Sequence, residues 1–146
     1  MATSVDEISR FLTKVPLFRS LKERQIRRLA ERIRERDFKV GEVIVEQGNP
    51  GIGLYIIVNG EARVVRRMSD GTGVTELDRL SRTQFFGELS LLEDAPRSAS
   101  VIADADMKCL VLNKLDFLDE LEQEPEMAIQ MLKELAHRFR RIIANM

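Results

Sequence analysis

The sequence has few residues of the kinds that build disulfides, metal sites and membrane spans. Its 146 residues include one cysteine, one histidine, one tyrosine and no tryptophan. Cys109 lies in the apolar run Met107–Leu112, which predicts a buried structural thiol. No apolar run reaches the roughly 18 residues of a membrane-spanning helix, and the first residues lack the basic and apolar regions of a signal peptide. We therefore expect a cytoplasmic protein that does not associate with membranes.

The sequence also lacks the motifs of the common catalytic sites. It has no P-loop, no nucleophile elbow and no pair of carboxylates with evident acid and base roles. The only histidine, His137, lies beside Arg138 and belongs to no recognisable metal-binding motif, which favours a surface or interface residue over a catalytic base. These absences predict a protein that is not an enzyme and has no cofactor or metal.

What remains is the composition of an ordinary globular domain. Hydrophobic residues make up 44% of the chain and charged residues 32%, with a net charge of −1. A chain of this length buries roughly two-thirds of its extended surface without disulfides or metals. The near-neutral charge gives no overall attraction to nucleic acid or anionic membranes. We expect one domain over residues 1–146.

Two helices are predicted in residues 1–37. Apolar residues recur at helical spacing over Asp6–Lys14, and Pro16 ends this first helix. Ser20, with Glu23 three positions later, is a capping-box signature for a second helix. We expect this second helix to continue through the arginine-rich segment that ends at Arg36.

The basic residues between Lys22 and Arg36 leave two interpretations open. Acidic residues are interleaved with them and no stacking aromatics are present, which favours a solvated helix face. The alternative is a nucleic-acid surface formed together with Arg138, Arg140 and Arg141.

The middle of the chain, residues 38–112, has the pattern of a β-roll. Short segments rich in Val, Ile, Leu or Tyr alternate with turns, as in an antiparallel sandwich or barrel. Asn59-Gly60 is the clearest hairpin turn, because a type I′ turn needs positive φ at both central positions. The predicted strands are Phe38–Val40, Val43–Gln47, Leu54–Asn59, Ala62–Met68, Val74–Leu80, Ser100–Ala103 and Met107–Leu112.

Two more helices are predicted in residues 113–146. Asn113 can cap a short helix that ends at Leu121, and Pro125 suits the first turn of a final helix that runs to about Ala144. The final helix carries an apolar stripe with the 3.6-residue period, formed by Met127, Met131, Leu132, Leu135, Ala136, Phe139, Ile142 and Ile143. The fold class expected is α+β, with an antiparallel β-roll between helices.

The stretch around which the rest is organised is Phe85–Ile102. A Gly87-Glu88 step precedes the apolar turn Leu89–Leu92, and an acidic turn then leads to Arg97 among small residues. The first N–H groups of a helical turn are unpaired and carry partial positive charge, so they favour anions. Arg97 can add a fixed positive charge, and the segment therefore predicts an anion site.

Residues 85–101 resemble the phosphate-binding cassette of the cyclic nucleotide-binding domain family, which includes the catabolite activator protein and protein kinase A regulatory subunits. The resemblance rests on Phe86-Gly87-Glu88-Leu89, followed by Pro96-Arg97-Ser98-Ala99-Ser100-Val101. It implies a double-stranded jelly roll with a C-terminal helical lid. It also implies a cyclic nucleotide as ligand.

The resemblance implies a role for each cassette residue. The planar fork of Arg97 suits two oxygens of one phosphate, and Glu88 would accept a hydrogen bond from the ribose 2′-hydroxyl. Backbone N–H groups of Gly87 and Leu89 would contact the sugar and phosphate, and Ser98 or the N–H of Ala99 would complete the phosphate contacts. The expected ligand-binding set is Phe86, Gly87, Glu88, Leu89, Ser90, Arg97, Ser98 and Ala99.

Alternatives stay open at these positions. Glu88 could cap its own helical turn, and Arg97 could pair with Glu93 or Asp94 at the surface. Ser98 occupies the position where family members that favour guanine often have threonine, so we expect cAMP to be favoured over cGMP.

A family member of this kind is expected to act as a sensor. Ligand binding would reorganise the cassette, and the helices after Asn113 would pass the signal on. The apolar stripe of the final helix exceeds what a β-roll covers, so we expect a homodimer through this helix, and a downstream protein effector is a further candidate partner. No recognition helix follows Ala144, so DNA binding of the kind known from the catabolite activator protein is not expected. Ile52 stands where many members carry an acidic residue, which supports the alternative of a degenerate interaction module without ligand.

Overall fold

The computed structural model describes residues 3–93 and 95–146, and these form two compact units. The helical unit contains the described residues up to Ile33 together with Leu115–Met146. The β-roll unit is the continuous segment Arg34–Lys114. The roll begins and ends in neighbouring strands, because its first and last strands pair with each other.

The helical unit contains α1 (Val5–Leu12), the 3₁₀ helix η1 (Pro16–Phe18), α2 (Glu23–Arg32), α4 (Lys114–Gln123) except for its first residue, and α5 (Pro125–Ala144). Within this unit α1 packs against α2, and α5 packs against η1. α5 begins at Pro125, as the sequence predicts, since proline suits the first helical turn. No helix in the described parts of the chain combines the length and apolar character needed to cross a membrane.

The start of α2 differs from the prediction. Ser20 is not its N-cap, because the N–H of Leu21 donates to the carbonyl of Phe18 at 3.1 Å and so extends the turn that follows η1. Helix α2 begins at Glu23, and the N–H of Lys22 donates to Oε1 of Gln25 at 2.7 Å. The glutamine three positions after the cap satisfies a backbone donor that the predicted Ser20 box does not reach.

The end of α2 also differs from the prediction, because residues 34–36 are not helical. Ile33 adopts an extended conformation, and Arg34–Phe38 forms strand β1, paired with β8. Two side-chain contacts hold this charged strand: Lys108 Nζ lies 3.0 Å from Glu35 Oε1, and the Arg36 guanidinium lies 5.1 Å from the centroid of the Phe38 ring. The strand exists because a partner strand completes its backbone hydrogen bonds, a contact between distant parts of the sequence.

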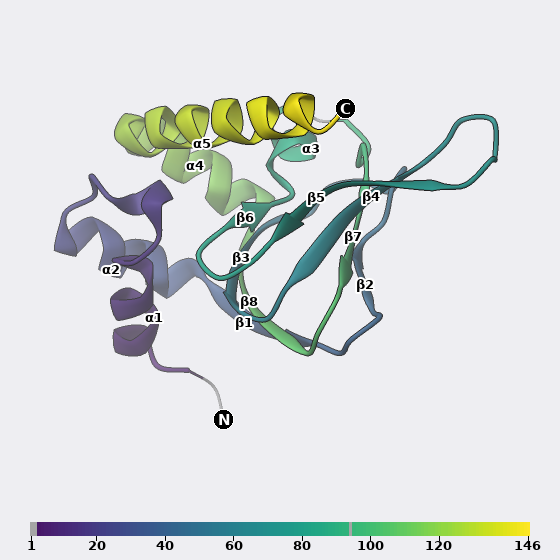
Figure 1. The fold of residues 1–146 in the computed structure, drawn as a ribbon. Coiled ribbons are helices and arrows are strands. Elements are labelled where there is room, and N and C mark those ends of the chain that lie inside the picture. The colour runs from purple at the N-terminus through teal and green to yellow at the C-terminus, as the bar shows by residue number, and fades with distance from the viewer. Residues whose placement is uncertain (1–2, 94) are drawn as a thin grey trace. The chain divides into compact units, whose positions relative to one another are not determined.

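The β-roll consists of two four-stranded antiparallel sheets (Figure 1). One sheet has the order β1-β8-β3-β6, in which β8 is Met107–Asn113, β3 is Gly53–Asn59 and β6 is Phe85–Phe86. The other has the order β2-β7-β4-β5, and its strands are Val43–Val45, Ser100–Ala103, Ala62–Arg67 and Val74–Leu80. A short helix, α3 (Glu88–Glu93), lies between β6 and β7 in the sequence.

The core of the roll comes from the inner faces of both sheets. Tyr55 and Ile57 of β3 pack in one cluster with Ala62, Leu80 and Val101 of the other sheet. Cys109 is fully buried in this cluster, as its apolar surroundings predict, and burial raises the pKa of its thiol to about 12. This core holds the start of β3 and the end of β6 in place, and both strand ends contribute to the site described below.

Candidate functional site

The predicted cassette forms a tight structure around Gly87, which links β6 to α3. Gly87 has a φ of +95°, a left-handed conformation that glycine adopts without strain. A Cβ at this position would lie 2.7 Å from Nη1 of Arg97 and 2.7 Å from the carbonyl oxygen of Gly53. Glycine therefore allows the backbone after β6 to approach both the arginine and the start of β3.

The side chain of Arg97 is buried, with 5% of the residue exposed. Its Nη1 donates to the carbonyl oxygen of Gly87 at 2.5 Å, and its Nη2 donates to the carbonyl oxygen of Gly53 at 3.2 Å. Its own backbone is fixed from both sides, since its N–H donates to Asn49 O and its carbonyl accepts from Gly48 N, each at 2.8 Å. The guanidinium is therefore part of the folded structure of the cassette.

The buried guanidinium of Arg97 carries a positive charge inside the roll. Burial lowers the pKa of the guanidinium, whereas the nearby Tyr55 hydroxyl and Glu88 carboxylate raise it. An arginine stays protonated under such opposing effects, because its intrinsic pKa is far above neutral. Both of its hydrogen bonds described above go to uncharged carbonyl oxygens. The site thus combines a buried positive charge with a carboxylate, Glu88, that is 2% exposed.

Helix α3 buries two polar side chains. Glu88 and Ser90 are buried together with Leu91, whereas Leu89 and Leu92 are 49% and 45% exposed. Buried polar groups are the informative departure from ordinary burial. Glu88 and Ser90 therefore belong to the interior of the cassette.

The remaining predicted site residues surround Arg97 at different depths. Phe86 is buried in β6, and its ring stacks on Tyr55 with centroids 5.0 Å apart. Ser98 is exposed and Ala99 is partly buried, directly before β7. The structure therefore gathers the predicted residues in one region of the β-roll unit.

The predicted alternative of a surface ion pair for Arg97 is wrong for Glu93. Arg97 is buried and its guanidinium hydrogen-bonds backbone carbonyls, so it is not the surface side chain that this alternative requires. Asp94, the other suggested partner, lies outside the described residues.

Two glycines that the sequence analysis did not assign to the site prove to be part of it. A Cβ on Gly51 would lie 2.6 Å from Cβ of Ser90 and 3.3 Å from Cζ of Arg97. The carbonyl oxygen of Gly53 accepts a hydrogen bond from Arg97. The spacing Gly51-Ile52-Gly53 directly before a strand is the signal that could have identified them, because such glycines often mark a close backbone approach.

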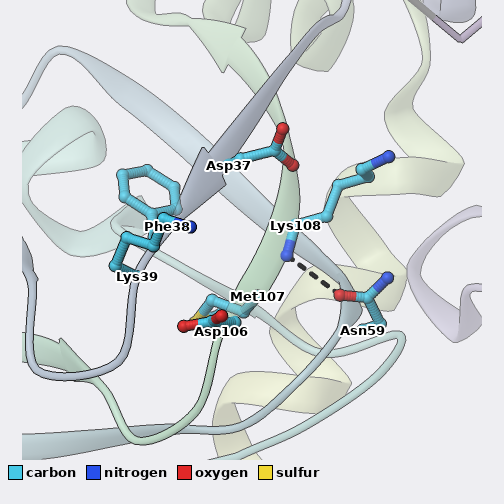
Figure 2. A pocket seen from close by; sticks show the side chains of 7 residues that line it. All are labelled: Asp37, Phe38, Lys39, Asn59, Asp106, Met107 and Lys108. Atoms are coloured by element: carbon cyan, nitrogen blue, oxygen red, sulfur yellow. Dashed lines mark hydrogen bonds between the residues drawn. The ribbon is translucent and has the colours of Figure 1, made fainter. Parts of the chain in front are cut away.

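A pocket of about 340 Å³ lies at the other end of β3 (Figure 2). It contains none of the predicted site residues, and two of its side chains accept hydrogen bonds from the backbone. Lys108 N donates to Asn59 Oδ1 at 3.1 Å, and Val40 N donates to Asp106 Oδ1 at 2.8 Å. The pocket is lined by Asp37, Phe38, Lys39, Asn59, Asp106, Met107 and Lys108. Asn59 and Asp106 hold backbone groups of neighbouring segments, and the cassette remains the candidate site.

Comparisons of sequence and structure relate the chain to known proteins. The family model described as "Cyclic nucleotide-binding domain" matches residues 35–124. A cAMP-dependent protein kinase regulatory subunit of Mucor circinelloides f. lusitanicus is 39% identical over 108 residues, which are 73% of this chain and 25% of that protein. The chain therefore spans about a quarter of the length of this relative.

Two solved structures share the fold. The regulatory domain of Toxoplasma gondii PKA, crystallised with cAMP, has a TM-score of 0.82 and 25% identity over 90% of this chain and 50% of its own. The regulatory subunit of a cAMP-independent protein kinase A from Trypanosoma brucei has a TM-score of 0.81 and 27% identity over 91% of this chain and 47% of its own. The predicted antiparallel β-roll with flanking helices is confirmed, and the chain belongs to the cyclic nucleotide-binding domain family.

Proposed function

We propose that the chain is a regulatory module, not an enzyme, that binds a cyclic nucleotide in its cassette and favours cAMP over cGMP. The observation that carries this proposal is the buried guanidinium of Arg97 beside the buried carboxylate of Glu88. A buried cation is stabilised by nearby negative charge, and Glu88 supplies part of it. A singly charged cyclic phosphate would add a second negative group that the guanidinium can bind directly.

The geometry of Arg97 leaves donors for the phosphate. A guanidinium has five N–H groups, and the hydrogen bonds to Gly87 and Gly53 use one from each terminal nitrogen. The others can point to phosphate oxygens while the bonds to the carbonyls persist. Glu88 would accept from the ribose 2′-hydroxyl, a group that a 3′,5′-cyclic nucleotide retains.

The contacts of Phe86, Gly87, Leu89, Ser90, Ser98 and Ala99 belong to the same proposal. Ser98 is exposed directly after the arginine, where its hydroxyl can reach the phosphate or the edge of a purine. Leu89 is half exposed and can cover the ligand from the side of α3. The preference for cAMP over cGMP is the most detailed claim of the proposal, and it rests on Ser98 alone.

A hydrogen bond supplies a route for the signal. The N–H of Lys114, the first residue of α4, donates to the carbonyl oxygen of Ile52 at 3.0 Å. Ile52 lies between Gly51 and Gly53, the two glycines that pack beside Arg97 or bond to it. A ligand that moves the guanidinium therefore acts on the segment to which the start of α4 is attached. Its effect is limited to its difference in affinity for the two arrangements.

The homodimer predicted from the sequence is a further part of the proposal. The large apolar residues on the outer side of α5, Ile129, Leu132, Phe139 and Ile143, are 50–67% exposed. Such a continuous apolar stripe on a surface helix favours a protein contact.

A thermal-shift experiment tests ligand binding. At a concentration 100 times Kd, a ligand adds about 2.7 kcal/mol to the free energy of unfolding, which for a chain of this size raises Tm by roughly 5–10 °C. We expect this rise with cAMP, a smaller one with cGMP at the same concentration, and none with 5′-AMP. The Arg97→Lys variant should lose about half of the rise or more, whereas Arg66→Ala, which changes an exposed arginine of β4, should keep it.

A second candidate function is an interaction module that binds no nucleotide. The exposed Ile52 favours it, since an apolar side chain stands in the loop beside Arg97 with 65% of its surface exposed. A relative of similar fold is the regulatory subunit of a Trypanosoma brucei kinase that is named as cAMP-independent, which supports keeping this candidate. Unchanged Tm with both cyclic nucleotides at millimolar concentration would favour this candidate.

The nucleic-acid alternative has weaker support in the structure than in the sequence. The segment Lys22–Arg36 is not one helix, and three of its arginines, Arg27, Arg28 and Arg32, pair with acids of the same chain. Arg27 bonds Asp6 at 2.7 Å, and Arg32 bonds Asp119 at 2.8 Å. A phosphate backbone would have to displace these carboxylates.

A further inference from the structure

Helix α5 has two apolar faces, and its own unit covers only one of them. Met127 and Met131 are buried, with exposed fractions of 0% and 2%. On another face Ile129, Leu132 and Phe139 are exposed by 50%, 67% and 65%. The outer stripe consists of Ile129, Leu132, Ala136, Phe139 and Ile143, all of them exposed.

The spacing of the outer stripe is that of a two-helix seam. Its residues follow one another at intervals of three, four, three and four, which corresponds to the a and d positions of a heptad repeat. A repeat of 3.5 residues favours the narrow contact between two helices, whereas a helix that packs on a broad core has a wider stripe. α5 has 20 residues and is about 30 Å long at 1.5 Å per residue, so several layers of this seam fit on it.

Charges beside the seam distinguish two orientations of a partner helix. Glu126 and Arg140 both occupy e positions of this heptad and both are exposed. In an antiparallel pair, e positions face e positions, and Glu126 of each helix lies next to Arg140 of the other. In a parallel pair, e positions face g positions, which here are the apolar Ala128, Leu135 and Ile142. Only the antiparallel arrangement gives these two charges opposite partners.

We propose that α5 pairs antiparallel with α5 of a second copy of this chain. In this register Ile129 packs against the partner's Phe139, and Leu132 packs against the partner's Ala136. The two-fold symmetry of the dimer forms each of these contacts a second time with the two copies exchanged. A large side chain then meets a small one in each central layer. Lys133 meets the partner's Lys133 near the axis, where the long side chains can separate into solvent.

This inference deepens the dimer of the proposed function, and it does not depend on nucleotide binding. A failed pairing leaves the thermal shift with cAMP unchanged, and a failed thermal shift leaves the pairing unchanged. The two claims are therefore tested separately.

Disulfide cross-linking measures the orientation directly. Ile129→Cys and Phe139→Cys variants are oxidised alone and as an equimolar mixture, and covalent dimers are identified on non-reducing gels and by mass spectrometry. An antiparallel pair brings position 129 next to position 139, but separates the two copies of position 129 by about 15 Å along the axis, at 1.5 Å per residue. This separation is beyond the reach of a disulfide. Native Cys109 can stay in place, because it is fully buried.

We expect a mixed disulfide in the mixture and none in either variant alone. Disulfides in each variant alone would show a parallel pair and overturn the proposal. A chain that sediments as a monomer at all concentrations would also overturn it.

A charge exchange checks the register independently. Glu126→Lys should weaken the dimer at least threefold in sedimentation equilibrium, because the introduced ammonium group then faces the partner's Arg140. Combining Glu126→Lys with Arg140→Glu should restore it. Glu122→Lys, the same charge change on the exposed surface of α4, serves as the control and should leave the dimer unchanged. If the double variant dimerises no better than Glu126→Lys, the antiparallel register is wrong.

Discussion

At the scale of single residues, Arg97 has a structural role in the cassette and a proposed role in ligand binding. The sequence alone does not distinguish the two. Arg97 donates hydrogen bonds to two backbone carbonyls, and in the proposed function it also holds a phosphate. Replacing it with alanine leaves both carbonyls without this donor, and an unsatisfied buried polar group costs about 1–3 kcal/mol. For this reason Arg97→Lys, which keeps the charge and some of the hydrogen bonding, is the better probe of ligand binding.

Arg97→Ala should lower the free energy of unfolding by about 2 kcal/mol without any nucleotide present. Urea denaturation followed by circular dichroism measures this. Arg66→Ala is the matched control and should change the free energy by less than about 0.5 kcal/mol. An Arg97→Ala variant as stable as the wild type would contradict a structural role for the guanidinium.

Gly87→Ala tests the close packing of the cassette. Gly87 and Gly71 both have positive φ, so alanine costs about 1 kcal/mol of backbone strain at either position. At Gly71 nothing lies within 4 Å of the new Cβ, whereas at Gly87 it meets Arg97 and the Gly53 carbonyl. We expect Gly87→Ala to be less stable than Gly71→Ala by about 1–3 kcal/mol in urea denaturation. Equal losses would mean that the cassette tolerates the added atom.

The residues of the cassette could be predicted from the sequence because they lie in one short motif. Every residue of the predicted ligand-binding set lies between Phe86 and Ala99. The order of glycine, acidic residue, apolar turn and arginine in this segment can be recognised without a structure. Gly51 and Gly53 could not be assigned in this way. Their importance comes from a contact with Arg97, more than 40 residues away in the sequence.

At the scale of elements, ion pairs join α2 to α4 inside the helical unit. Glu120 of α4 is 2% exposed, and its carboxylate accepts from Nη2 of Arg28 at 3.2 Å and lies 3.4 Å from Nε of Arg32. Nη1 of Arg32 also forms an ion pair with Oδ2 of Asp119 at 2.8 Å. A buried carboxylate between two cations makes the contact between these helices specific.

Glu120→Gln should lower the free energy of unfolding by about 1–2 kcal/mol, because a neutral amide at this buried position cannot compensate the two arginines. The neighbouring Glu122 is exposed, and Glu122→Gln should have almost no effect. Thermal and urea denaturation compare the two variants. A larger loss for Glu122→Gln than for Glu120→Gln would contradict the assigned contact.

The contribution of Asp119 should depend on pH. Hydrogen bonds from Gln123 and Arg32 hold the pKa of Asp119 below its usual value. A carboxylate with a lowered pKa stabilises the folded state above the ordinary pKa of about 4, and this contribution is lost as the pH falls through the lowered pKa. The difference in unfolding free energy between the wild type and Asp119→Asn should therefore shrink between pH 7 and pH 3. A constant difference would show that the carboxylate is not stabilised in the folded state.

Helices and most strands could be predicted from the sequence, but β1 could not. The segment Arg-Glu-Arg-Asp-Phe has four charged residues in a row, with no alternation of apolar and polar residues. It becomes a strand because β8 satisfies its backbone groups, and no local pattern records that pairing. The two-residue strand β6 was not predicted for a similar reason, since it is defined by its pairing with β3.

At the scale of the whole molecule, the β-roll unit contains the cassette with its buried arginine, and the helical unit carries the apolar stripe of α5. Binding at the first and pairing at the second are separate proposals. The hydrogen bond from Lys114 to Ile52 connects the cassette loop to the start of α4. If this bond transmits the signal, ligand should change amide hydrogen exchange at Lys114 in the wild type and leave it unchanged in Arg97→Lys.

Calorimetric titration tests the central claim most directly. Wild-type protein and Arg97→Lys are each titrated with cAMP and with cGMP, and circular dichroism verifies that both proteins are folded. We expect one cAMP per chain, weaker binding of cGMP, and at least tenfold weaker binding of cAMP to Arg97→Lys, because lysine cannot offer a planar pair of donors. Absence of binding at millimolar nucleotide, or equal affinity of the two proteins for cAMP, would contradict the account.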